Sequence, residues 1–115
     1  MIIWIIGLSG SGKTTLGLEV IRIVRKKKQN IILLDGDEFR ETFDNDLGYT
    51  LKDRKRNAKR ISKFCKFCEK QNIHVVCPIL SIWPETRSWN RRNLKEYFEV
   101  FIDTSIEELK YRDSK

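Results

Sequence analysis

The sequence lacks any apolar run that approaches the roughly 20 residues needed to cross a bilayer. Its apolar opening, residues 1–6, has no basic residue before it and leads directly into a glycine-rich segment, so it predicts a buried strand and not a signal peptide. Internal repeats and low-complexity linkers are also absent. We therefore expect a single domain over residues 1–115, located in the cytoplasm, with no membrane partner.

Cysteine is scarce, and its odd count of three in a chain without a secretory signal predicts reduced thiols. Cys65 and Cys68 have redox-motif spacing, and with His74 and Cys77 they supply four candidate zinc ligands. However, Cys65 and Cys68 share a face of a predicted long helix with Ile61, far from the helix N-terminus that would stabilise a thiolate. We interpret both cysteines as core residues.

Acidic residues are outnumbered, because 23 Lys and Arg against 16 Asp and Glu give a formal net charge of +7. This balance favours an anionic partner, either nucleic acid or a small substrate that carries phosphate or sulfate. The densest basic run, residues 25–28, closes a predicted helix, where cations suit the negative end of the helix dipole. We interpret that run as a solvated helix end, and we predict a small-molecule nucleotide partner and no nucleic acid.

Hydrophobic periodicity predicts four strands, at residues 2–6, 31–34, 73–78 and 98–102, of which the first two are expected to be buried. Helices are predicted after the glycine-rich segment, from Leu51 to Gln71, after Pro84 and from Ser105 to Arg112. The apolar face of the first helix is assigned to Leu16, Val20, Ile23 and Val24. This alternation is typical of an α/β fold, a parallel sheet flanked by helices, with the first strand inside the sheet.

The strongest motif lies between the first strand and the first helix. Gly7-x-x-x-x-Gly12-Lys13-Thr14 matches the phosphate-binding loop, or P-loop, residue for residue. Its glycines let backbone N–H groups point at phosphate oxygens, and the helix N-terminus adds its positive dipole end. We expect Lys13 to reach the β- and γ-phosphates of ATP and the Thr14 hydroxyl to ligate Mg²⁺. The predicted ATP-binding residues are Gly7, Ser9, Gly10, Ser11, Gly12, Lys13, Thr14 and Thr15.

The P-loop alone does not separate kinases from GTPases and ATPases. No guanine-reading Asn-Lys-x-Asp segment occurs, and the strand at residues 73–78 ends without the acidic residue that ATPase motors usually carry. The only carboxylates that follow the end of a buried predicted strand in this way are those of Asp35 and Asp37, after the second strand. Because the carboxyl ends of parallel strands border the ligand crevice, we expect both to face the phosphates.

Four motifs follow one another in the order found in adenylylsulfate kinases, at residues 7–15, 34–40, 46–50 and 53–60. The sequence resembles that family from Met1 to its end. The resemblance implies a P-loop nucleoside triphosphate hydrolase fold with strand order 2-3-1-4-5. It also implies an ATP-dependent kinase that uses Mg²⁺ and transfers the γ-phosphoryl group to the ribose 3′-hydroxyl of adenosine 5′-phosphosulfate, a step of sulfate activation.

Roles carry over from the family by position. Asp37 is expected to be the base or to hold a water on Mg²⁺, with Asp35 supporting it. The expected catalytic residues are therefore Lys13, Asp35 and Asp37. The expected metal ligands are Thr14 and, through water, Asp37. The residues expected to hold the acceptor are Arg40, Tyr49, Arg54, Asn57 and Ser81. From the residues alone, Arg54 and Asn57 share one inward helix face, and a guanidinium suits phosphate or sulfate oxygens.

The sequence departs from the family in two places. Where the family usually has a Phe-Ile-Ser-Pro-Tyr segment, this chain has residues 77–84 of different composition, so the pocket wall against the acceptor base differs. This leaves a cytidine diphosphate derivative, such as cytidine diphosphoramidate, as an alternative acceptor, and a non-catalytic ATP-binding protein as a further alternative. The sequence also stops at Lys115, before the family's basic lid and last strand, so we expect both to be missing and catalysis to be weak. The oligomeric state stays open, a homodimer included.

Overall fold

The computed structural model describes residues 1–8 and 10–102, and four parallel strands form its sheet. They are β1 (Ile2–Ile6), β2 (Ile31–Leu33), β3 (His74–Ile79) and β4 (Tyr97–Phe101), in the order β2-β3-β1-β4. β1 pairs in parallel with both β3 and β4, and β2 pairs in parallel with β3. The prediction of a parallel sheet with the first strand inside it is confirmed, with strand limits shifted by one residue.

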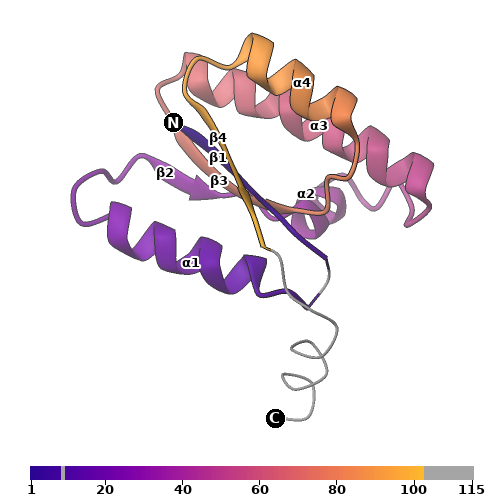
Figure 1. Ribbon diagram of the computed structural model, residues 1–115, viewed down its shortest axis with the longest axis horizontal. Helices are drawn as coiled ribbons and strands as arrows, with labels where there is room; N and C mark the ends of the chain where they lie inside the picture. Colours follow the sequence, from indigo (N-terminus) through magenta and orange to yellow (C-terminus); the bar gives the residue numbers. More distant parts are fainter. Residues whose placement is uncertain (9, 103–115) are drawn as a thin grey trace.

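Helices cover both faces of the sheet (Figure 1). α1 (Lys13–Val24) lies on one face, and α3 (Leu51–Lys70) and α4 (Pro84–Asn93) lie on the other, with the short α2 (Gly36–Thr42) beside α3. Among the described residues, no helix combines the length and the apolar character needed to span a membrane.

The two faces of β1 belong to two separate hydrophobic clusters, because successive strand residues point to opposite sides. Ile2, Trp4 and Ile6 pack with the residues of α3, whereas Ile5 packs with Ile21 of α1. All six residues of β3 are buried as well. The apolar run of β1 therefore corresponds to a strand that is buried on both faces, as predicted, whereas Phe98, Val100 and Phe101 of β4 are exposed.

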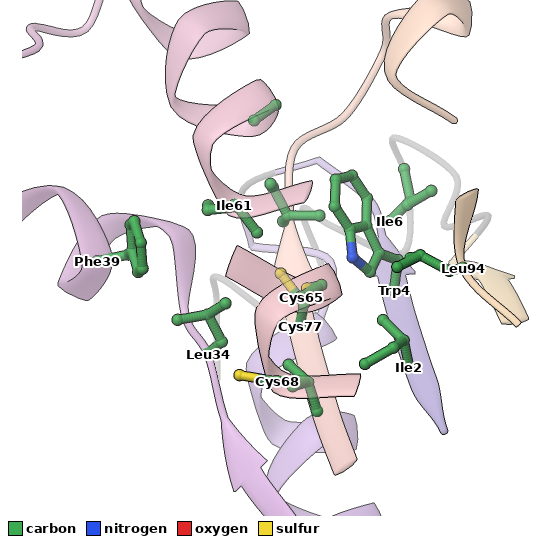
Figure 2. Close-up of a cluster of buried hydrophobic side chains, with 13 residues drawn as sticks. Ile2, Trp4, Ile6, Leu34, Phe39, Ile61, Cys65, Cys68, Cys77 and Leu94 are labelled. Atoms are coloured by element: carbon green, nitrogen blue, oxygen red, sulfur yellow. The ribbon is translucent and has the colours of Figure 1, made fainter. Parts of the chain in front are cut away.

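Cysteines fill the centre of the larger cluster (Figure 2). Cys65 and Cys68 come from α3 and Cys77 from β3, and all three are buried free thiols beside Trp4 and Leu34. Burial raises the pKa of Cys65 to about 12 and raises the pKa of Cys77 well above its ordinary value. The interpretation of Cys65 and Cys68 as core residues is confirmed.

The predicted apolar face of α1 is only partly right. Val20 and Val24 pack on the sheet as predicted, together with Ile21, and Gly17 is buried there as well. Leu16 and Ile23, which were assigned to the same face, are exposed. α2 was not predicted from the sequence, and it begins directly after Asp35, because the Asp35 carboxylate caps the helix. The helix predicted from Ser105 to Arg112 lies outside the described residues.

Candidate active site

The P-loop connects the carboxyl end of β1 to the start of α1, which places it at the ligand-binding edge of a parallel sheet. Gly10 and Gly12 have φ angles of 80° and 92°, which favour glycine because other residues are strained there. Lys13 begins α1, and its Nζ donates to the Leu8 carbonyl oxygen at 3.3 Å. The loop therefore has the backbone geometry that the motif predicts, although Ser9 lies outside the described residues.

Asp35 connects the P-loop to α2. Its Oδ1 accepts hydrogen bonds from the backbone N–H groups of Asp37, at 2.9 Å, and Glu38, at 3.3 Å. Its Oδ2 accepts from the Thr14 hydroxyl at 3.4 Å. Both carboxylate oxygens thus have partners, and one of them lies beside the hydroxyl expected to ligate Mg²⁺.

Asp37 lies one residue into α2 and has a different environment. Its Oδ1 accepts from Arg40 Nη2 at 2.8 Å, while its Oδ2 makes no hydrogen bond within the described part of the chain. Its side chain is 71% exposed, whereas that of Arg40 is only 2% exposed. Asp37 therefore presents one unengaged carboxylate oxygen, with the second oxygen held by a buried cation.

Tyr49 closes over Arg40 on the outer side. The Arg40 guanidinium carbon lies 3.8 Å from the centre of the Tyr49 ring, a cation–π contact, and the Arg54 guanidinium carbon lies 5.4 Å from it. Arg54 Nε also donates to the Tyr49 carbonyl oxygen at 3.0 Å. The ring itself is 64% exposed, so it offers an open aromatic face next to two guanidinium groups.

Asn57 projects from α3 toward the start of α2. Its Nδ2 donates to the Gly36 carbonyl oxygen at 3.0 Å, and its Oδ1 accepts from Arg60 Nη2 at 3.0 Å. The side chain is buried, at 5% exposure. One further Nδ2 hydrogen and one Oδ1 lone pair remain for a ligand, because an amide has two donors and two acceptor sites.

A cleft of about 260 Å³ joins these elements. Its lining includes the P-loop residues Gly10, Lys13 and Thr14, the α2 residues Gly36, Asp37 and Arg40 with their cap Asp35, and the α3 residues Arg54 and Asn57. It also includes Pro78, Ile79 and Leu80 at the end of β3, which sequence reasoning did not assign. Their position was foreseeable, since β3 neighbours β1 and its carboxyl end must border the same crevice.

Ser81 and Thr15 are not among the residues that line this cleft. Ser81 is fully buried, and its hydroxyl has no hydrogen-bond partner among the described residues. Thr15 is exposed on α1. Gly7, Ser11, Gly12 and Tyr49 are not among the lining residues either. The roles assigned to the individual site residues all remain predictions.

The oxygen donors at this cleft fit Mg²⁺. That ion is held by one or two carboxylates with substrate phosphates and water, and it does not need an all-protein cage. The Thr14 hydroxyl and the Asp35 carboxylate converge within 3.4 Å, beside the loop that would hold the phosphates. Within residues 1–8 and 10–102, no group of three or more His, Cys, Asp or Glu side chains forms a metal cluster, so the cysteine zinc site has no geometric support.

Comparison with known proteins decides the family. The family model described as adenylylsulphate kinase matches residues 1–115. The chain belongs to this family. Among relatives, this adenylylsulphate kinase family member is 40% identical over 114 residues to the cytidine diphosphoramidate kinase of Campylobacter jejuni, a match that covers 99% of the chain and 66% of that protein. It is 35% identical over 113 residues to the adenylyl-sulfate kinase of Halothermothrix orenii, covering 98% of the chain and 61% of the relative.

A solved structure supports the same assignment. The family member superposes on the APS kinase of Mycobacterium tuberculosis, solved in complex with AMPPNP and APS, with a TM-score of 0.81 and 33% identity. That match covers 99% of this chain and 68% of the other. The chain thus spans about two thirds of the length of the relatives it matches.

Proposed function

We propose that this protein is an ATP-dependent kinase that transfers the γ-phosphoryl group to the ribose 3′-hydroxyl of a nucleotide, with adenosine 5′-phosphosulfate as the acceptor. The observation that carries the proposal is the cleft in which three groups of residues meet. The P-loop supplies Lys13, the start of α2 supplies Asp35 and Asp37, and α2 and α3 supply Arg40 and Arg54. Family membership and the relatives that act on such nucleotides support the same assignment.

Phosphoryl transfer depends mainly on positioning and on stabilising negative charge. Lys13, the first residue of α1, would contact the β- and γ-phosphates. Thr14 and Asp35 would hold Mg²⁺, which neutralises phosphate charge when bound. Asp37, with one unengaged oxygen, is the group in the cleft suited to orient the acceptor hydroxyl and take its proton late in the reaction.

The acceptor side of the cleft is suited to an anionic nucleotide. Arg54 offers a planar guanidinium, which matches the oxygens of phosphate or sulfate, and Asn57 offers a remaining amide N–H. The exposed Tyr49 ring is not part of the cleft lining, but it lies beside the lining residues Arg40 and Arg54 and is suited to stack on a base. Stacking on an aromatic ring does not discriminate adenine from cytosine, so these residues support the nucleotide class and not one base.

A cytidine diphosphate derivative is the second candidate acceptor. The 40% identity to a cytidine diphosphoramidate kinase favours it. The segment after β3 also departs from the usual family composition, with Ile82 and Trp83 near the cleft residue Leu80 in sequence. The chemistry at the 3′-hydroxyl would be the same for both acceptors.

The deciding experiment measures transfer of labelled γ-phosphate from ATP to adenosine 5′-phosphosulfate and to cytidine diphosphoramidate at equal concentrations. The 3′-deoxy form of each acceptor is the control, because it keeps every contact except the reacting hydroxyl. Transfer to adenosine 5′-phosphosulfate, and none to its 3′-deoxy form, supports the proposal. Transfer only to the cytidine compound assigns the second acceptor. ATP binding without transfer to either acceptor, also when the chain is extended through the family's lid segment, indicates a non-catalytic nucleotide-binding protein.

A further inference from the structure

Arg60 lies on α3, outside the group of residues that line the cleft, yet it holds two parts of the site together. Its Nη1 donates to both carboxylate oxygens of Asp46, at 3.1 and 3.0 Å. Its Nη2 donates to Asn57 Oδ1 at 3.0 Å. One planar guanidinium thus joins the segment that carries Tyr49 to the amide that faces the acceptor side of the cleft.

These bonds fix which end of the Asn57 amide points where. Arg60 is a donor only, so it requires an oxygen opposite it, and the Gly36 carbonyl is an acceptor only, so it requires the Asn57 nitrogen. Both partners therefore select the same orientation of the amide. Without Arg60, the amide oxygen of Asn57 loses its hydrogen-bond donor. The hydrogen bond from Asn57 to the Gly36 carbonyl oxygen, between Asp35 and Asp37, is then weakened.

The remaining contacts of Arg60 limit its movement. Its guanidinium carbon lies 4.2 Å from the centre of the Phe43 ring and 5.5 Å from that of Phe39. The side chain is 24% exposed, compared with 52% for Asp46. Asp46 is the carboxylate that faces the Arg60 guanidinium, and packing of that guanidinium against the two rings keeps it directed at Asp46 and Asn57.

We propose that Arg60, held by Asp46, is a positioning residue that sets the Asn57 amide and the Asp35–Asp37 segment for the acceptor. This inference rests on the proposed function, since it names a residue that prepares the same cleft. Arg60 acts through Asn57 and does not touch the reacting groups. A lysine cannot replace it, because a single ammonium lacks the planar fork that binds two partners in fixed directions.

The test compares Arg60→Lys and Asp46→Asn with Arg56→Lys, an exposed arginine of the same helix that makes no ion pair among the described residues. For Arg60→Lys, we expect kcat/KM for the acceptor to fall about tenfold to a hundredfold, the loss of a charge-assisted hydrogen bond, while the Kd for MgATP stays within twofold. Asp46→Asn should give a smaller loss in the same parameter, and Arg56→Lys should give none.

A second readout does not depend on turnover. The side-chain amide signal of Asn57, assigned in ¹⁵N spectra by its disappearance in Asn57→Asp, should shift in Arg60→Lys and stay in place in Arg56→Lys. If the parent protein transfers phosphoryl to neither acceptor, the proposed function fails, and this signal alone decides whether Arg60 sets the amide. An unshifted signal overturns the inference.

A purely structural role gives a different pattern. In that case Arg60→Lys would lower the acceptor kcat/KM and the MgATP affinity by the same factor, together with the melting temperature, and the inference would be wrong. An acceptor kcat/KM within twofold of the parent would also overturn it.

Discussion

Asp35 and Asp37 are two residues apart, but they make different contacts, and this separates the effects of changing them. Asp37 has one oxygen on Arg40 and one unengaged, so Asp37→Asn removes the charge and the basic oxygen and keeps the shape. We predict a loss of turnover of about 10²–10⁴, the range for a positioned base, and a Kd for MgATP within a few-fold of the parent. Rapid-quench turnover and calorimetry measure the two quantities.

Asp35→Asn is the matched comparison. Asparagine caps a helix about as well as aspartate, so α2 should keep its start and the protein its stability. Turnover should fall less than in Asp37→Asn, because the role of Asp35 is support beside Thr14. The reverse order of losses would exchange the two roles, and near-parental turnover in both variants would place catalysis elsewhere.

At the site, the sequence predicts which residues line the cleft better than it predicts how they are held. The P-loop and the acids after the second strand follow from local motifs and from the rule for parallel strands. The burial of Arg40 under Tyr49 does not, since it depends on how residues 43–50 fold back over α2. The two hydrogen bonds of the Asn57 amide, to Gly36 and Arg60, are likewise not predictable from the sequence, because the first requires that α3 lies close to Gly36.

At the scale of elements, α1 shows why helical spacing is ambiguous in an apolar segment. Leu16, Val20, Ile23 and Val24 fit one predicted face. The face that packs on the sheet carries Gly17 and Ile21 beside Val20 and Val24, and it leaves Leu16 and Ile23 exposed. The small Gly17 allows α1 to approach Pro78 and Leu33 closely, a feature that counting large apolar residues overlooks. α2 was missed because Asp35-Gly36-Asp37 is typical of both a turn and a capped helix start.

The corrected face of α1 predicts different costs for two isoleucines on one helix. Ile21 is 5% exposed and packs against Ile5, Ile31 and Val76, whereas Ile23 is 53% exposed. Ile21→Ala should lower the free energy of unfolding by about 2–5 kcal/mol through the cavity that it leaves. Ile23→Ala should change it by no more than about 0.5 kcal/mol. Urea unfolding measures both, and equal costs would contradict the assignment.

The thiols between α3 and β3 predict a loss of stability at alkaline pH. Burial raises the pKa of Cys65 to about 12 and the pKa of Cys77 well above its ordinary value, so both stay protonated in the folded protein well above pH 9. Burial raises the pKa of Cys68 as well. In the unfolded chain a thiol ionises near about pH 8.5. The unfolded state then binds fewer protons, so the free energy of unfolding falls with rising pH, by up to about 1.4 kcal/mol per pH unit and thiol.

The window for this effect runs from about pH 9 toward pH 12, and the contribution is fully present below it. Urea unfolding of the parent and of Cys65→Ala across that window provides the measurement. In Cys65→Ala the free energy of unfolding should fall less steeply with pH than in the parent. The difference should equal the contribution of the one thiol removed, because the other groups titrate as in the parent. Parallel declines in the two proteins would contradict a buried, protonated Cys65.

At the scale of the whole molecule, the excess of positive charge divides between the cleft and the surface. Arg40, Arg54 and Lys13 line the cleft, whereas the run at residues 25–28 follows the end of α1 and is mostly exposed. Such a division favours steering of a small anion toward the cleft. A nucleic-acid module would instead show tight oligonucleotide binding that falls steeply with salt.

The stability of the whole chain should report whether MgATP binds at the P-loop. MgATP that binds only the folded state should stabilise it by about 2.7 kcal/mol at a hundredfold excess over Kd. For a domain of this size that corresponds to a rise in melting temperature of about 10 °C. Lys13→Ala should abolish the rise and leave the melting temperature without ligand unchanged, because Lys13 is half-buried at most and its Nζ bonds only the Leu8 carbonyl oxygen among the described residues. An equal rise in the variant would show that the nucleotide binds elsewhere than at the P-loop.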